Sequence, residues 1–158
     1  MSKWRAAFWQ GDRLVAMANR GAPVALLLLR ICLAAVFIPS GWGKLHDLGK
    51  VTEFFTELGI PAPHLNAIVV AMCELGCGIL LLLGLLSRAA ALPLIASMAV
   101  AIVTAKRADI TGIADLFALD ELIYAALLFV VVALGPGRFA LDALARRFTA
   151  RVESPASL

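Results

Sequence analysis

The amino-acid sequence predicts an all-α protein, a transmembrane four-helix bundle, from its composition, its four apolar runs and its distribution of cations. Of the 158 residues, 62% are hydrophobic and only 16% are charged, whereas a soluble domain is usually about half apolar and a quarter charged. A soluble globule of this composition would leave large apolar patches in water. The composition therefore excludes a disordered or fibrous chain and argues against a water-soluble enzyme.

Four apolar runs have the length of a membrane-crossing helix, which needs roughly 17–25 residues to cross about 30 Å of hydrocarbon. The runs cover residues 23–39, 65–86, 89–105 and 116–134. Helices are expected because backbone polar groups in lipid must be hydrogen-bonded within their own segment. Pro39 and the Ser-Gly-Trp-Gly that follows it are expected to end the first run near the membrane surface.

Lysine and arginine residues indicate the orientation of these runs. Nine of the cations fall in the N-terminal tail, the turn after the second run and the C-terminal tail, and four fall in the two loops on the opposite side. The positive-inside rule then places both termini in the cytoplasm. The formal net charge of +3 is modest and does not suggest nucleic-acid binding.

The loop between the first two runs has an amphipathic pattern. Val51, Phe54, Phe55 and Leu58 recur at helical spacing before Gly59. This pattern predicts a short amphipathic helix in the first outer loop. Such a helix either packs on the end of the bundle or forms a lid over a binding site.

Both ends of the chain combine aromatic with basic residues, which is typical of interfacial helices at an anionic membrane surface. The sequence therefore divides into three parts. An interfacial amphipathic N-terminal segment covers residues 1–21, the transmembrane domain covers residues 22–145, and a basic, partly disordered tail covers residues 146–158.

Three ionisable residues lie inside the predicted spans: Arg30, Glu74 and Glu121. Arg30 and Glu74 each lie nine residues from the outer end of their run, which is about 13 Å of helix. Antiparallel helices would bring both residues to the depth expected for Glu121. Tyr124 is three residues after Glu121 and so lies on the same face of its helix. Because a central arginine costs roughly 2.5–3.5 kcal/mol to insert, Arg30 is expected to pair with the two carboxyl groups.

This predicted cluster has two interpretations. In the first it is a binding pocket, because a guanidinium, a carboxylate and a titratable acid could hydrogen-bond a carbonyl and supply a proton, as quinone chemistry requires. In the second it is a structural clasp that fixes the register of the helices. The sequence names no catalytic residue and shows no metal site, because the three cysteines lie in apolar runs without a zinc-binding spacing. A quinone or quinol would therefore be a bound ligand rather than a cofactor encoded by a motif.

Four stretches together resemble the DoxX family of small bacterial membrane proteins in order and spacing. They are LLLRICLAAVFIPSGWGK at 27–44, FFTELGIPAP at 54–63, CELGCGILLLLGLLSR at 73–88 and LGPGRFALDAL at 134–144. The resemblance covers roughly residues 24–145. It implies a four-helix bundle in the bacterial inner (plasma) membrane.

The resemblance also implies an association with respiratory or thiol redox chemistry. Relatives include subunits of a thiosulfate:quinone oxidoreductase, a member described as linking a superoxide dismutase to a sulfurtransferase, and many proteins labelled only as oxidoreductases. Arg30, Glu74 and Glu121 fall where similar polar residues recur in the family, and Lys44 falls in its Gly-Trp-Gly-Lys turn. A histidine that often follows the third span in relatives is replaced here by Lys106 and Arg107, so its role does not transfer.

The expected function is that of a redox-associated membrane subunit that binds a quinone or quinol in a pocket formed by Arg30, Glu74 and Glu121, with Tyr124 and Lys44 as further candidates. Whether it is an enzyme stays open, because the chain has no visible redox centre of its own. The alternative is a non-enzymatic membrane anchor or scaffold for redox partner proteins, and a third hypothesis is transport of a small molecule or proton. The expected partners are the lipid bilayer, redox proteins and a second copy of the chain.

Overall fold

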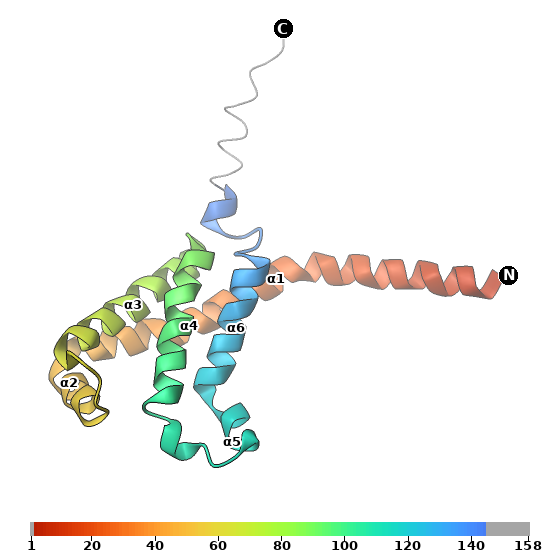
Figure 1. Ribbon diagram of the computed structural model, residues 1–158. Helices are drawn as coiled ribbons and strands as arrows, with labels where there is room; N and C mark the ends of the chain where they lie inside the picture. The colour runs from red at the N-terminus through yellow and green to blue at the C-terminus, as the bar shows by residue number, and fades with distance from the viewer. Residues whose placement is uncertain (1, 145–158) are drawn as a thin grey trace, which may run out of the picture.

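The computed structural model describes the backbone of residues 2–144 and the side chains of residues 21–144, and this part of the chain is entirely helical (Figure 1). Its elements are α1 (Ser2–His46), α2 (Leu48–Glu57), α3 (Pro63–Leu83), α4 (Ser87–Val103), the 3-10 turn η1 (Arg107–Asp109), α5 (Ile113–Ala118) and α6 (Asp120–Leu134). The predicted all-α fold is confirmed. The predicted tail at 146–158 lies outside the described residues.

Within the described side chains of residues 21–144, two segments are long and apolar enough to cross a membrane: Gly21–His46 of α1, and α3. A third, α4, is a shorter apolar helix. Many large apolar side chains of these helices point away from the protein, including Leu28, Met72 and Val100. Such exposure is expected where the surrounding solvent is lipid.

The first helix is much longer than the sequence predicted. The prediction that its span ends at Pro39 is wrong, because α1 continues through Pro39 for two more turns to His46. A proline removes one backbone hydrogen bond, but membrane helices tolerate it where neighbouring groups compensate. The residues between Gly41 and Lys44 are therefore helical rather than a turn. The N-terminal part of α1 projects away from the other helices (Figure 1).

Helices α1 and α3 run antiparallel in very close contact. A Cβ atom added at Gly41 would lie 2.8 Å from the carbonyl oxygen of Ala71 and would collide with the backbone of Leu75. One added at Gly78 would lie 3.0 Å from Ile38. Glycine at these points lets the two backbones approach, as is common in membrane helix pairs. The contacts also set the register, in which the second half of α1 lies beside the middle of α3.

One hydrophobic core joins the four long helices. Its buried members include Leu33 and Phe37 from α1, Leu81 from α3, Leu94 from α4 and Leu128 from α6. Around this core, α1 pairs with α3 and α4 pairs with α6 (Figure 1). The predicted amphipathic helix of the first loop is present as α2, which packs against α3.

The fourth predicted span is split. At Leu119 the backbone is extended (φ −71°, ψ 128°), so α5 ends there and α6 begins at Asp120 instead of residue 116. The corner before α5 is organised by Asp115. Its carboxylate accepts hydrogen bonds from the hydroxyl of Thr111 (2.6 Å) and from the backbone N–H groups of Thr111 (3.0 Å) and Gly112 (2.9 Å).

These hydrogen bonds predict how the corner responds to pH. The Thr111 hydroxyl, followed by the two backbone N–H groups, holds the pKa of Asp115 below its ordinary value of 3.8. The stabilisation is therefore fully present above pH 3.8 and is lost as pH falls through the lower, folded-state pKa. We expect the Thr111 and Gly112 amides to lose protection from hydrogen exchange only in that acidic window. In Asp115→Ala these two amides should lose their protection already at neutral pH. If they were as protected in this variant as in the wild type, the Asp115 carboxylate would not be their acceptor.

Candidate functional site

A polar cluster lies where α1 crosses the middle of α3. Glu74 is buried, with a relative exposure of 2%. Its carboxylate accepts a hydrogen bond from the hydroxyl of Ser40 (2.8 Å) and forms an ion pair with the ammonium of Lys44. Lys44 Nζ also donates to Ser40 Oγ (2.9 Å), which closes the set. We call Ser40, Lys44 and Glu74 the Glu74 cluster.

The helix geometry of α1 explains why these side chains converge. Ser40 and Lys44 are four residues apart, so they share one face of α1 only because the helix continues past Pro39. Gly41 lies between them and brings this face within reach of α3. The close approach of the two backbones therefore brings both the hydroxyl and the ammonium to the same carboxylate oxygen, Oε2 of Glu74.

The members of the cluster differ in their access to the surface. The Glu74 side chain is 3% exposed and the Lys44 side chain is 27% exposed. A carboxylate buried to this degree needs a charged or hydrogen-bonding partner, and here it has both. The cluster combines a hydroxyl, an ammonium donor and a carboxylate acceptor in an otherwise apolar contact. Chemically, such a set can hydrogen-bond a polar headgroup and exchange a proton with it.

Arg30 lies elsewhere, so the predicted pairing of Arg30 with Glu74 and Glu121 is corrected by the structure. Its Nη2 donates to the carbonyl oxygen of Phe139 (3.3 Å), and Asp142 is the carboxylate whose charge acts on it. The antiparallel register is the physical reason. Arg30 lies ten residues, about 15 Å of helix, before Ser40 and beside the turn that follows α3.

Residues that follow α6 close this end of the bundle over Arg30. The N–H of Asp142 donates to the carbonyl oxygen of Gly84 (3.2 Å), and Ala140 packs against the same glycine. Arg30 is 1% exposed, and its Nε and Nη1 have no hydrogen-bond partner among the described residues. The guanidinium therefore depends on the segment after α6 for its acceptor, rather than on the carboxylates of the spans.

Gly84 is predicted to be much less tolerant of substitution than Gly59. Both have a positive φ (72° and 69°), so alanine is strained at either position. A Cβ at Gly84 would also collide with Arg30 and lie 2.7 Å from the Cβ of Ala140, whereas nothing lies within 4 Å of one at Gly59. We expect Gly84→Ala to destabilise the protein by about 2 kcal/mol more than Gly59→Ala in denaturant unfolding in detergent. Equal losses would show that Arg30 does not occupy this position.

The other two predicted site residues belong to different surroundings. Glu121 Oε1 lies 4.0 Å from Lys106 Nζ, beside the loop that links α4 to α5. The ring of Tyr124 packs edge-on against Phe37, with centroids 6.1 Å apart, as part of the core. Of the five predicted residues, the structure thus brings only Lys44 and Glu74 together. It adds Ser40, which the sequence could have indicated only through its four-residue spacing from Lys44.

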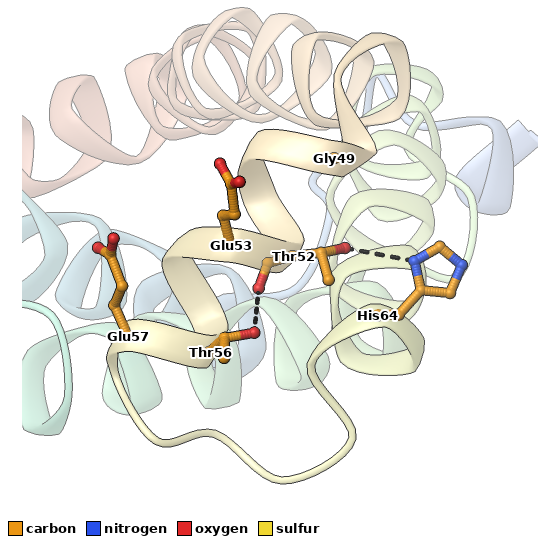
Figure 2. Close-up of a pocket in the computed structure, with 6 residues that line it drawn as sticks. All are labelled: Gly49, Thr52, Glu53, Thr56, Glu57 and His64. Carbon is orange, nitrogen blue, oxygen red and sulfur yellow. Dashed lines mark hydrogen bonds between the residues drawn. The ribbon is translucent and has the colours of Figure 1, made fainter.

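A shallow cleft of about 540 Å³ lies beside α2 (Figure 2). It is lined by Gly49, Thr52, Glu53, Thr56, Glu57 and His64. Thr52 Oγ1 lies 3.3 Å from His64 Nδ1, whereas the two glutamates point to the other side of the helix from this histidine (Figure 2). Within residues 21–144, no group of three or more His, Cys, Asp or Glu side chains is placed to hold a metal ion.

Comparisons with known proteins identify the family of the chain. A family model described as DoxX matches residues 25–107, more than half of the chain. The chain is 34% identical over 143 residues to the uncharacterized membrane protein Rv3486 of Mycobacterium tuberculosis, covering 81% of this chain and 86% of that protein. It is 30% identical over 125 residues to the inner membrane protein YphA of Escherichia coli, covering 76% and 89%. No solved structure matches. The chain therefore belongs to the DoxX family and is a membrane protein.

Proposed function

We propose that the protein is a redox-associated subunit of the bacterial inner membrane that binds the headgroup of a quinone or quinol at the Glu74 cluster. The observation that supports this proposal is a carboxylate with 3% exposure, hydrogen-bonded to a hydroxyl and paired with an ammonium, inside an apolar helix pair. Ionisable groups at such positions in membrane helices are commonly functional. The proposal narrows the predicted site to Glu74 and Lys44 and adds Ser40.

The three side chains supply what a quinone headgroup needs. The ammonium of Lys44 and the hydroxyl of Ser40 donate to a quinone carbonyl, and the carboxylate of Glu74 accepts from a quinol hydroxyl. Reduction of a quinone takes two electrons and two protons. The electrons come from a redox partner protein in this proposal, and Glu74 and Lys44 exchange the protons with the surface that Lys44 reaches.

The proposed orientation follows the distribution of cations, with both termini in the cytoplasm. In this orientation α1 ends and α3 begins at the outer face, so the Glu74 cluster lies in the outer half of the membrane. Arg30 then lies toward the cytoplasmic face. The partners that we propose for the protein are redox proteins and a second copy of the chain.

Binding of a short-chain benzoquinone and of its quinol to the purified protein in detergent tests the proposal. Glu74→Gln keeps the size of the side chain but removes the charge that accepts from a quinol, so we expect binding of the corresponding quinol to weaken about tenfold or more. Glu121→Gln is the matched control, because Glu121 is also near the membrane but lies outside the cluster, and its binding should equal that of the wild type. Unchanged binding in Glu74→Gln would contradict the proposed site.

A second candidate function is a membrane anchor for partner proteins, favoured by the part of α1 that projects from the bundle (Figure 1). Its sequence combines Trp4 and Trp9 with Arg5 and Arg13, which suits docking at a membrane surface or on a protein. The double variant Lys44→Met/Glu74→Met distinguishes the two functions. An anchor keeps its co-purifying partners in this variant, whereas a quinone-binding subunit loses quinone binding.

A further inference from the structure

A second group of chemically active side chains lies on α3, outside the Glu74 cluster. Cys73 and Cys77 are four residues apart, and their sulfur atoms are 3.9 Å from each other. Both are free thiols, and both are only partly buried. Cys32, the third cysteine, is a free thiol on the exposed surface of α1.

The spacing of the two sulfur atoms suits a bridging ion better than a disulfide. A disulfide needs a sulfur separation of about 2.05 Å and Cβ atoms about 3.5–4.5 Å apart, whereas Cβ atoms four residues apart on a helix are about 5–6 Å apart. Two metal–sulfur bonds of about 2.3 Å instead separate the sulfur atoms by about 3.8 Å at a tetrahedral angle and about 4.0 Å at a trigonal one. The observed 3.9 Å lies between these values, so α3 would not need to bend.

Met98 on α4 is the candidate for a third sulfur ligand. Both cysteines pack against the hydrophobic core that contains Met98, whose side chain is nearly buried (8% exposed). Helices α3 and α4 are antiparallel and are joined by a three-residue turn at 84–86. Cys73 lies ten residues before the end of α3 and Met98 lies eleven residues after the start of α4, so both are at about the same distance from the turn. The neighbouring carboxylate, Glu74, is already engaged by Ser40 and Lys44.

We propose that Cys73, Cys77 and the thioether of Met98 form a binding site for a soft monovalent metal ion, Cu(I). Thiolate and thioether ligands in an apolar site select Cu(I), whereas Zn²⁺ usually takes four ligands. Each cysteine that binds the ion releases its thiol proton to solvent, and the copper stays Cu(I) throughout. The site is independent of the proposed quinone site, since it uses Cys73 and Cys77 of α3 and Met98 of α4.

Titration of the full-length protein in detergent with Cu(I), under anaerobic conditions and against a chromophoric Cu(I) chelator, tests this proposal. We expect the wild type to bind one Cu(I) per chain. Cys73→Ala and Cys77→Ala should each weaken Cu(I) binding at least about 100-fold, because loss of a direct ligand costs more than the roughly 10–100-fold that is typical for a residue that only hydrogen-bonds a ligand. Met98→Leu, which keeps the volume and removes the sulfur, should weaken it less. Cys32→Ala is the matched control and should bind as the wild type does.

X-ray absorption of the copper-loaded wild type gives a readout that does not depend on the folding of any variant. A first shell of sulfur atoms alone supports the site, and a shell dominated by nitrogen or oxygen overturns it. Failure of the wild type to hold copper against the chelator also overturns it, as does full binding by the Cys73→Ala/Cys77→Ala double variant. Because Glu74→Gln leaves all three sulfur ligands in place, it should bind Cu(I) normally even if it loses quinone.

Discussion

Lys44→Met is expected to destabilise the bundle by about 3 kcal/mol, whereas Glu74→Met is expected to cost about 1 kcal/mol. The difference arises from unequal burial within one ion pair. Lys44→Met leaves a carboxylate that is 3% exposed and whose remaining partner within residues 21–144 is the Ser40 hydroxyl. Glu74→Met leaves an ammonium whose side chain is 27% exposed and can turn toward water. Unfolding by denaturant in detergent micelles measures both losses.

Two further variants control this prediction. The double variant Lys44→Met/Glu74→Met should be at least as stable as Lys44→Met alone, because no unpaired charge remains buried. Lys50→Met removes a lysine that pairs with Asp47 but is 83% exposed, and it should cause no measurable change. Equal losses in the two single variants at the Glu74 cluster would contradict the asymmetric burial on which the prediction depends.

Gly41→Ala is expected to destabilise the protein by about 3 kcal/mol, whereas Gly43→Ala, two residues later on the same helix, should be neutral or slightly stabilising. A Cβ at Gly41 would lie 2.8 Å from the Ala71 carbonyl oxygen and 2.9 Å from the Leu75 Cα, and backbone atoms cannot move aside as a side chain can. Nothing lies within 4 Å of a Cβ at Gly43. Thermal unfolding in detergent compares the two variants directly.

The Gly41 prediction extends to the site, because the same close contact holds Ser40 and Lys44 against Glu74. Gly41→Ala should therefore weaken quinone binding as well as stability, whereas Gly43→Ala should leave both unchanged. If the two alanine variants were equally stable, the backbones of α1 and α3 would be farther apart than the contacts of Gly41 require.

The helical fold was predictable because it depends on composition and run length, which a single sequence contains. The site depended on register, which the apolar runs do not specify. Treating Pro39 as the end of the first span moved the boundary by about two turns of helix. That shift of seven residues accounts for most of the ten-residue error that placed Arg30 opposite Glu74, where the glycine contacts place Ser40. A lipid-facing leucine pattern matches several registers equally well, and only the small residues distinguish between them.

The break at Leu119 shows a second limit of the sequence. The apolar run from 116 to 134 contains no proline or glycine, and the acidic residues Asp120 and Glu121 in the first turn of α6 are a weak local signal of the helix start there. The hydrogen bonds of Asp115 to Thr111 and Gly112 fix the start of α5, and they depend on the path of the preceding loop. The amphipathic spacing in the first loop, by contrast, predicted α2 correctly because it is a local pattern.

The acceptor for Arg30 has a consequence for biosynthesis. Phe139, whose carbonyl oxygen receives the guanidinium, is made 109 residues after Arg30. At about 5–20 residues per second, the ribosome needs about 5–20 s to reach it. During that interval the nascent first helix holds a cation without its final acceptor, so it is expected to keep Arg30 among lipid headgroups. Assembly of that end of the protein is then completed only when the last part of the chain has been translated.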